Sequence, residues 1–146
     1  MSHAFNDWNP DAQLGEVRAD VGSWMVGTKE GAFEEVALAL FRWQASNNQV
    51  YRRFLEAMGT DVRGIERVDD IPCLPVEMFK HHQVQSGDWT PHHAFKSSGT
   101  SGQRHRSTHL LDSDGLTWYR DVASRAWSQI WGKEVAHHQW LGLLPG

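Results

Sequence analysis

Hydrophobic positions follow a helical period in the segment that begins at Gly31. Apolar side chains recur three or four residues apart up to about Ser46, at Phe33, Val36, Ala37, Leu40 and Phe41. This spacing places them on one face of an α-helix. Residues 1–30 show no such period, because isolated apolar residues are mixed there with Gly, Asp and Asn. We expect these residues to form an irregular arm with about one helical turn.

A second apolar stripe follows the interruption at Asn47 and Asn48. It consists of Val50, Tyr51, Phe54, Leu55 and Met58. Gly59 comes next, in the usual position of a left-handed C-cap. The pattern therefore predicts a second helix and, with the first, a helical hairpin. Further along, the prolines keep residues 71–75 extended. Pro75 can then open a short helix over 76–80. With the two helices before it, this short helix makes 31–80 the helical region of the chain.

The rest of the chain, 81–146, mixes short strands with one long helix. The pattern predicts strands at 82–85, 94–97, 107–111 and in the apolar run 140–146. Asp112 or Ser113 is expected to cap a long helix that ends at Gly132. Its apolar face contains Leu116, Tyr119, Ala123, Ala126, Trp127 and Ile130. The fold class is therefore α/β, of α+β appearance in this chain, and we expect one unit that is the N-terminal fragment of a larger layered domain.

Composition narrows the class of protein. The chain has 146 residues, 40% of them hydrophobic and 22% charged, with a net charge of −4, as in one globular unit. This charge favours neither nucleic acid nor a membrane surface as a partner, and no run approaches the roughly 20 apolar residues of a membrane span. With no signal peptide recognised and the single Cys73 unable to form an internal disulfide, we expect a cytoplasmic protein.

The candidate chemistry lies in the loop Ser97–Gly102. Gly99 and Gly102 let the backbone approach a ligand and adopt positive φ, so that successive N–H groups can face one anion. The hydroxyl donors are those of Ser97, Ser98, Thr100 and Ser101, and positive charge comes from Arg104 and Arg106. Such donors suit the phosphates of a nucleotide. The spacing excludes a Walker A loop and a dinucleotide-binding fingerprint, and the loop runs between two predicted strands rather than into a helix.

The segment Phe95–Gly102 resembles the phosphate loop of the acyl-adenylate-forming superfamily. The closer resemblance is to the acyl-protein synthetases, which are long-chain-fatty-acid–protein ligases, and to phenylacetate-CoA-ligase-like proteins. The stretches Ile71–Lys80 and Leu141–Pro145 support it by their order and spacing. The resemblance implies that a carboxylic acid, usually a fatty acid, reacts with ATP and Mg²⁺ to give acyl-AMP and pyrophosphate. The acyl group then passes to a thiol, which can be a protein cysteine.

The same resemblance implies individual roles. Ser98, Thr100 and Ser101 would bind the β- and γ-phosphates, while Gly99 and Gly102 would let the backbone close over them. Ser97 would shape the start of the loop. Where many members have Pro-Lys after the second glycine, this chain has Gln103, Arg104, His105 and Arg106, which retain positive charge. The remaining catalytic and metal-binding residues of the family come later in its sequences, so no catalytic residue is assigned here.

Other features admit different interpretations. The nine histidines suggest no metal site, because His81-His82, His92-His93 and His137-His138 are adjacent pairs whose side chains diverge. Cys73 is expected to be a packing residue rather than an acyl acceptor, and most of the eight tryptophans to anchor the core. Two other functions stay open. One is a non-catalytic binding module, or an oligomer, that docks through the helices of 31–59 and the tryptophan-bearing face of 123–131. The other is an anion-binding regulator that uses Arg104 and Arg106.

Overall fold

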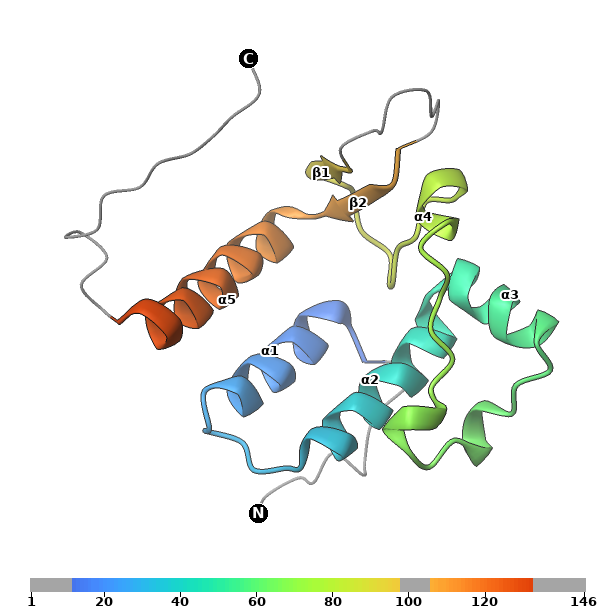
Figure 1. Ribbon diagram of the computed structural model, residues 1–146, viewed down its shortest axis with the longest axis horizontal. Helices are drawn as coiled ribbons and strands as arrows, with labels where there is room; N and C mark the ends of the chain where they lie inside the picture. The colour runs from blue at the N-terminus through green and yellow to red at the C-terminus, as the bar shows by residue number, and fades with distance from the viewer. Residues whose placement is uncertain (1–11, 98–105, 133–146) are drawn as a thin grey trace.

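The computed structural model describes residues 12–97 and 106–132 (Figure 1). Its elements in chain order are α1 (Leu14–Met25), α2 (Phe33–Asn47), α3 (Gln49–Ala57), the 3₁₀ turns η2 (Val62–Gly64) and η3 (Val68–Asp70), α4 (Met78–His81), β1 (His93–Lys96), β2 (Thr108–Leu111) and α5 (Ser113–Trp131). Helices predominate over one sheet of two antiparallel strands. The predicted mixed class of α+β appearance is therefore confirmed.

The two predicted helices of the 31–59 region are present and share one capping residue. Asn48 ends α2, where its N–H donates to the carbonyl of Gln44 at 2.8 Å. Its side-chain Oδ1 then accepts from the N–H of Tyr51 at 3.0 Å, which starts α3. Gly59 follows α3 with a φ of 65°, the left-handed conformation expected there. One asparagine thus turns the chain between the helices.

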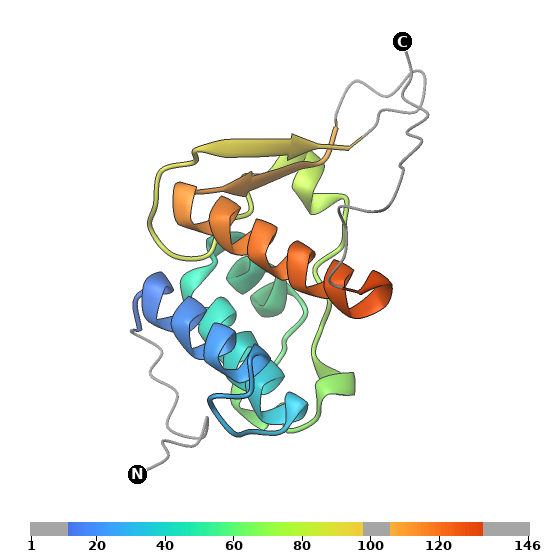
Figure 2. The ribbon, with the colours of Figure 1, turned by 90° about the vertical axis from the view of Figure 1, so that its left-hand side faces the viewer.

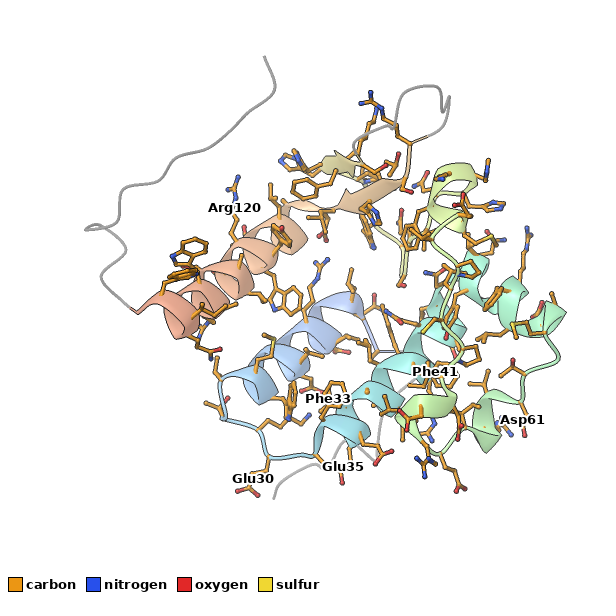
Figure 3. The ribbon with its side chains drawn as sticks, viewed as in Figure 1. Glu30, Phe33, Glu35, Phe41, Asp61 and Arg120 are labelled. Carbon is orange, nitrogen blue, oxygen red and sulfur yellow. The ribbon has the colours of Figure 1, made fainter. Side chains whose placement is uncertain are left out.

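Helix α2 lies at the centre of the core. One side of it packs against α3, where Phe41, labelled in Figure 3, and Ala45 meet Tyr51 and Leu55. Its other side packs against α1, and the residues of that contact are Val36, Ala39, Val21 and Trp24. Burial of each large apolar side chain in such a core contributes about 1.5–3 kcal/mol. Figure 1 shows α1 and α2 side by side, so the helical body is organised around α2.

The tryptophans divide between the core and the surface. Trp43 on α2 is 2% exposed, and its indole N–H donates to the carbonyl of Ala12 at 3.0 Å. This tryptophan is a core anchor of the kind expected from the sequence. Trp131, at the end of α5, is 53% exposed. None of the described helices combines the length and the hydrophobicity needed to cross a membrane.

The prediction of an irregular arm over residues 1–30 is wrong for the part that the structure describes. Residues 14–25 form the 12-residue helix α1, in which Val17 is buried. Gly15 and Gly22 weaken the helical pattern in this segment, since glycine is a poor helix former. Packing against α2 compensates for this intrinsic weakness, and packing of that kind cannot be read from a local window.

The predicted strand at 82–85 is also wrong. This segment follows α4 as an irregular connection. The amide of Gln85 donates to the carbonyls of Gly87 and Trp89, at 3.3 and 2.7 Å. The short helix expected at 76–80 is found at Met78–His81. The strand predicted in 140–146 lies outside the described residues.

The predicted strands on either side of the glycine loop are confirmed as β1 and β2. They pair antiparallel with Phe95 opposite His109 and Lys96 opposite Thr108. The long predicted helix is confirmed as α5, which begins at Ser113 directly after β2. Figure 2 shows the hairpin at one end of the helical body, above α5.

Candidate functional site

Two hydrogen bonds close the base of the glycine loop. The N–H of Ser97 donates to the carbonyl of Ser107 at 3.0 Å, and the N–H of Ser107 donates to Oγ of Ser97 at 3.1 Å. Ser107 is 4% exposed, whereas Ser97 is exposed. The hydroxyl of Ser97 therefore extends the strand pairing by one step, and it holds the two ends of the loop side by side.

The other predicted phosphate ligands divide into two groups. Arg106 is described; it is exposed and directly precedes Ser107, and its carbonyl accepts from Oγ1 of Thr108 at 3.5 Å. The rest lie outside the described residues, namely Ser98, Gly99, Thr100, Ser101, Gly102 and Arg104. Their roles stay predictions.

Aromatic contacts attach the hairpin to the helices on both sides. The rings of Phe95 and Tyr119 have their centroids 5.5 Å apart, which joins β1 to α5. The rings of His109 and Phe79 have theirs 4.7 Å apart, which joins β2 to α4. Aromatic pairs at such separations stabilise by about 0.5–1.5 kcal/mol beyond their burial. The hairpin is therefore packed against both helices.

The contact between Phe79 and His109 places one stretch that carried the family resemblance against the strand that follows the glycine loop. Phe79 belongs to Ile71–Lys80, and His109 lies on β2, the strand that follows the glycine loop. No local pattern indicated this pair, because the two residues belong to separate elements. The third stretch, Leu141–Pro145, lies outside the described residues.

An ion pair anchors the far end of β2. The guanidinium of Arg18 on α1 donates two hydrogen bonds, each of 2.8 Å, to the carboxylate of Asp112. Asp112 also caps α5, because its Oδ1 accepts from the N–H of Gly115 at 2.7 Å. The hydrogen bonds from Arg18 are the main reason that the pKa of Asp112 lies below its usual range. The sequence analysis predicted Asp112 as a cap of α5. No pattern in the sequence indicated that Arg18 would contact it.

Two clefts border helix α2, and the second of them also borders the hairpin. The first, which we call the Tyr51 cleft, has a volume of about 440 Å³ and lies between α2, α4 and the segment 71–74. The second, which we call the Trp89 cleft, has a volume of about 290 Å³ and lies between α1, α2 and β2. In the first cleft, the hydroxyl of Tyr51 donates to the carbonyl of Pro72 at 2.6 Å. Burial raises the pKa of this hydroxyl to about 12, and the nearby Cys73 adds to the shift.

Cys73 itself differs from the expectation. Its side chain is exposed at the edge of the Tyr51 cleft, so the prediction of a packing residue is wrong. The prolines on either side keep the segment extended, and this holds the thiol at the surface rather than in the core. Within residues 12–97 and 106–132, no three side chains of His, Cys, Asp or Glu gather where they could hold a metal ion.

The face expected to dock in a binding module is largely exposed. Ile130 and Trp131 on α5 are 73% and 53% exposed. On the same helix, Arg120 points away from α1 (Figure 3). Docking of a partner or a second copy on this face stays a prediction.

The fold and the site define a small α+β protein that carries a hydroxyl- and glycine-rich hairpin loop on a helical body. Residues 17–137 match the family described as acyl-protein synthetase, LuxE, and the chain belongs to this family. The predicted resemblance is thereby confirmed. Membership implies an acid substrate, a protein acceptor and the use of ATP. No curated protein and no solved structure matches the chain.

Proposed function

We propose that the loop Ser97–Gly102 binds the pyrophosphate part of ATP while a carboxylic acid, in the first place a fatty acid, is converted to acyl-AMP. The acyl group then passes to a thiol of the acceptor protein. Membership in the acyl-protein synthetase family supports this reaction. The observation that supports the loop as the phosphate site is its closed base, where Ser97 and Ser107 exchange hydrogen bonds of 3.0 and 3.1 Å.

The reaction needs stabilisation of the leaving group. An oxygen of the acid attacks the α-phosphorus, the bond to the bridging oxygen of the β-phosphate breaks, and negative charge grows on pyrophosphate. Donors held in place before the reaction stabilise such charge, and loss of one costs about 2.7–4 kcal/mol. The hydroxyls of Ser98, Thr100 and Ser101 and the guanidinium groups of Arg104 and Arg106 are the proposed donors.

The donor set suits phosphate better than it suits a metal ion. Residues 97–106 contain hydroxyl, backbone and guanidinium donors but no carboxylate, and Mg²⁺ prefers oxygen ligands that include carboxylates. We therefore propose that Mg²⁺ reaches the loop bound to the phosphates of ATP. The loop residues would then bind the phosphate oxygens that the metal leaves free.

The replacement Thr100→Val tests this function. It removes one proposed donor while keeping the size of the side chain, and Thr108→Val on β2 is the matched control. The rate of fatty-acid-dependent exchange of labelled pyrophosphate into ATP should fall by about 10²–10³ in Thr100→Val and stay unchanged in Thr108→Val.

Titration calorimetry with pyrophosphate, and with sulfate as the simpler anion, gives a second readout. Pyrophosphate should bind the natural chain and bind Thr100→Val more weakly, while sulfate binds neither appreciably. Equal pyrophosphate binding by both chains contradicts the assignment of the loop. Equal binding of sulfate and pyrophosphate by the natural chain favours the anion-binding regulator instead.

A further inference from the structure

The Tyr51 cleft and the Trp89 cleft adjoin each other. Gln44, Val84 and Ser86 line both of them, so the two clefts are neighbours across these side chains. Their volumes are about 440 and 290 Å³, and we refer to the two adjoining clefts together as the hollow. Leu110 and Leu111 of β2, the strand that follows the glycine loop, border its Trp89 part.

The two parts of this hollow differ in chemistry. The Trp89 cleft is lined mainly by apolar side chains, which are Leu14, Val17, Val21, Leu40, Trp43, Val84, Trp89, Leu110, Leu111 and Trp118. Arg18 and Gln85 also line the Trp89 cleft. The Tyr51 cleft is of mixed character, because Asn48, Tyr51 and Cys73 line it together with Ile71, Pro72, Leu74 and Phe79. A site that is mainly apolar at one end and has polar groups at the other is complementary to an amphiphilic molecule.

Gln44 stands at the junction with its side-chain amide available. The polar neighbours already have partners, since Asn48 donates to Oγ of Ser86 at 3.0 Å and Tyr51 donates to Pro72. The Gln44 side chain forms no hydrogen bond with any other described residue. An amide presents two N–H donors, which a carboxylate or an acyl oxygen can accept.

The hollow also has a direction with respect to the loop. Phe79 lines the Tyr51 cleft and packs on His109, near the end of β2 that adjoins the loop. Leu110 and Leu111 line the Trp89 cleft at the opposite end of β2. Figure 1 shows α4 beside the loop end of the hairpin and α1 toward its far end. The polar part therefore lies nearer the loop than the apolar part does.

We propose that this hollow is the binding site of the carboxylic acid substrate. The apolar chain of the acid lies in the Trp89 cleft, and the amide of Gln44 donates to its carboxylate, which faces the loop end of the hairpin. The proposal rests on the function proposed above, because it assigns a site to the acid that the reaction consumes. Binding of the acid, however, does not require the loop.

The test measures binding of dodecanoate to the 146-residue chain by calorimetry in the absence of ATP. Val84→Trp fills the junction of the clefts and should weaken binding at least about tenfold, since the added ring takes the space of the ligand. Val50→Trp is the matched control, because Val50 lines a separate cleft between α3 and α4. This control should bind dodecanoate as the natural chain does.

Gln44→Leu separates recognition of the head group from filling of the space. It should weaken binding of dodecanoate about tenfold and leave binding of dodecanol, which lacks the carboxylate, within about twofold. Equal losses for both ligands, or an equal loss in Val50→Trp, would overturn the proposal, as would absence of dodecanoate binding by the natural chain. Thermal unfolding of each variant verifies that it is folded.

Failure of this proposal can be told apart from failure of the proposed function. Thr100→Val should bind dodecanoate normally, because the loop is not part of the hollow. If dodecanoate does not bind while Thr100→Val still abolishes pyrophosphate exchange, only the acid site is wrong. If dodecanoate binds as expected while Thr100→Val has no effect on exchange, only the loop assignment is wrong.

Discussion

Arg18 and Asp112 form a two-point ion pair that joins the first described helix to the last. Both hydrogen bonds measure 2.8 Å, and the residues are 94 positions apart in the sequence. The side chains are only 20% and 19% exposed, so solvent screens the pair less than it screens an ordinary surface pair. Because Asp112 directly follows β2 and caps α5, this contact fixes where the strand ends and the helix starts.

Replacement of Asp112 should separate its two tasks. Asp112→Asn keeps a good N-cap but removes the negative charge that faces Arg18, whereas Asp112→Ala removes both. We expect a loss of about 1 kcal/mol in the free energy of unfolding for Asn and about 2 kcal/mol or more for Ala. Urea unfolding at neutral pH measures both. No loss in Asp112→Asn would show that the charge contributes nothing, and equal losses in the two variants would show that the cap contributes nothing.

The same ion pair predicts how stability changes in acid. The pKa of Asp112 is lower in the folded chain than its ordinary value of 3.8, chiefly because of the hydrogen bonds from Arg18. The unfolded chain therefore binds the proton first, and the stabilisation is present above pH 3.8 and is lost as the pH falls below it. Unfolding of the natural chain should be more acid-sensitive than that of Asp112→Asn. Identical pH profiles would contradict this.

We expect that Gly115 is needed because neighbouring side chains leave no space for a Cβ atom, and not because of its backbone conformation. A Cβ atom there would lie 2.5 Å from Oδ1 of Asp112 and 2.7 Å from Nη2 of Arg18. Gly115→Ala should therefore disturb the ion pair and destabilise the chain by about 1–3 kcal/mol. At Gly22 on α1, a Cβ atom would meet only Nε1 of Trp118, at an ordinary 3.8 Å.

Gly22→Ala is thus the matched control for Gly115→Ala. It should stabilise the chain by about 0.5–1 kcal/mol, because alanine is the better helix former. The midpoint of thermal unfolding should move down for Gly115→Ala and up for Gly22→Ala. A shift in the same direction for both would refute the steric explanation.

The raised pKa of Tyr51 predicts that the folded chain loses stability in alkali. Its pKa is raised from 10.0 to about 12 in the folded chain. The unfolded chain loses the phenolic proton first, so this contribution is present below pH 10 and is lost as the pH rises toward about 12. In Tyr51→Phe, stability should depend less on pH in this range. Urea unfolding at several alkaline pH values tests this, with Tyr119→Phe as the control, since Tyr119 is 52% exposed.

The hydroxyl of Ser97 should protect the base of the loop. Ser97→Ala removes the acceptor of the Ser107 N–H, which is 3.1 Å away. Loss of one such hydrogen bond costs about 1 kcal/mol, so amide hydrogen exchange at Ser107 should become about fivefold faster. Ser124→Ala, on the exposed surface of α5, serves as the control. Unchanged exchange at Ser107 would mean that the backbone pairing alone closes the loop.

Local patterns predicted the elements that carry their own signals. The stripes of α2, α3 and α5, the left-handed Gly59 and the aspartate at the start of α5 all depend on residues within a few positions of one another. Helix α1 escaped prediction because its glycines weaken the local signal, while its stability comes from packing on α2. The prediction of a strand at 82–85 failed because a local sequence pattern does not show whether a partner strand is there to pair with the segment.

The candidate site also has features that the sequence determined and features that only the tertiary structure decided. The sequence by itself determined the glycine and hydroxyl composition of the loop, its position between two strands and the family to which the chain belongs. Only the tertiary structure decided that Phe79 meets His109, that Arg18 pairs with Asp112 and that Gln44 lines two adjoining clefts. Helix and turn preferences act between near neighbours in the chain, whereas these contacts depend on which distant surfaces the fold brings together.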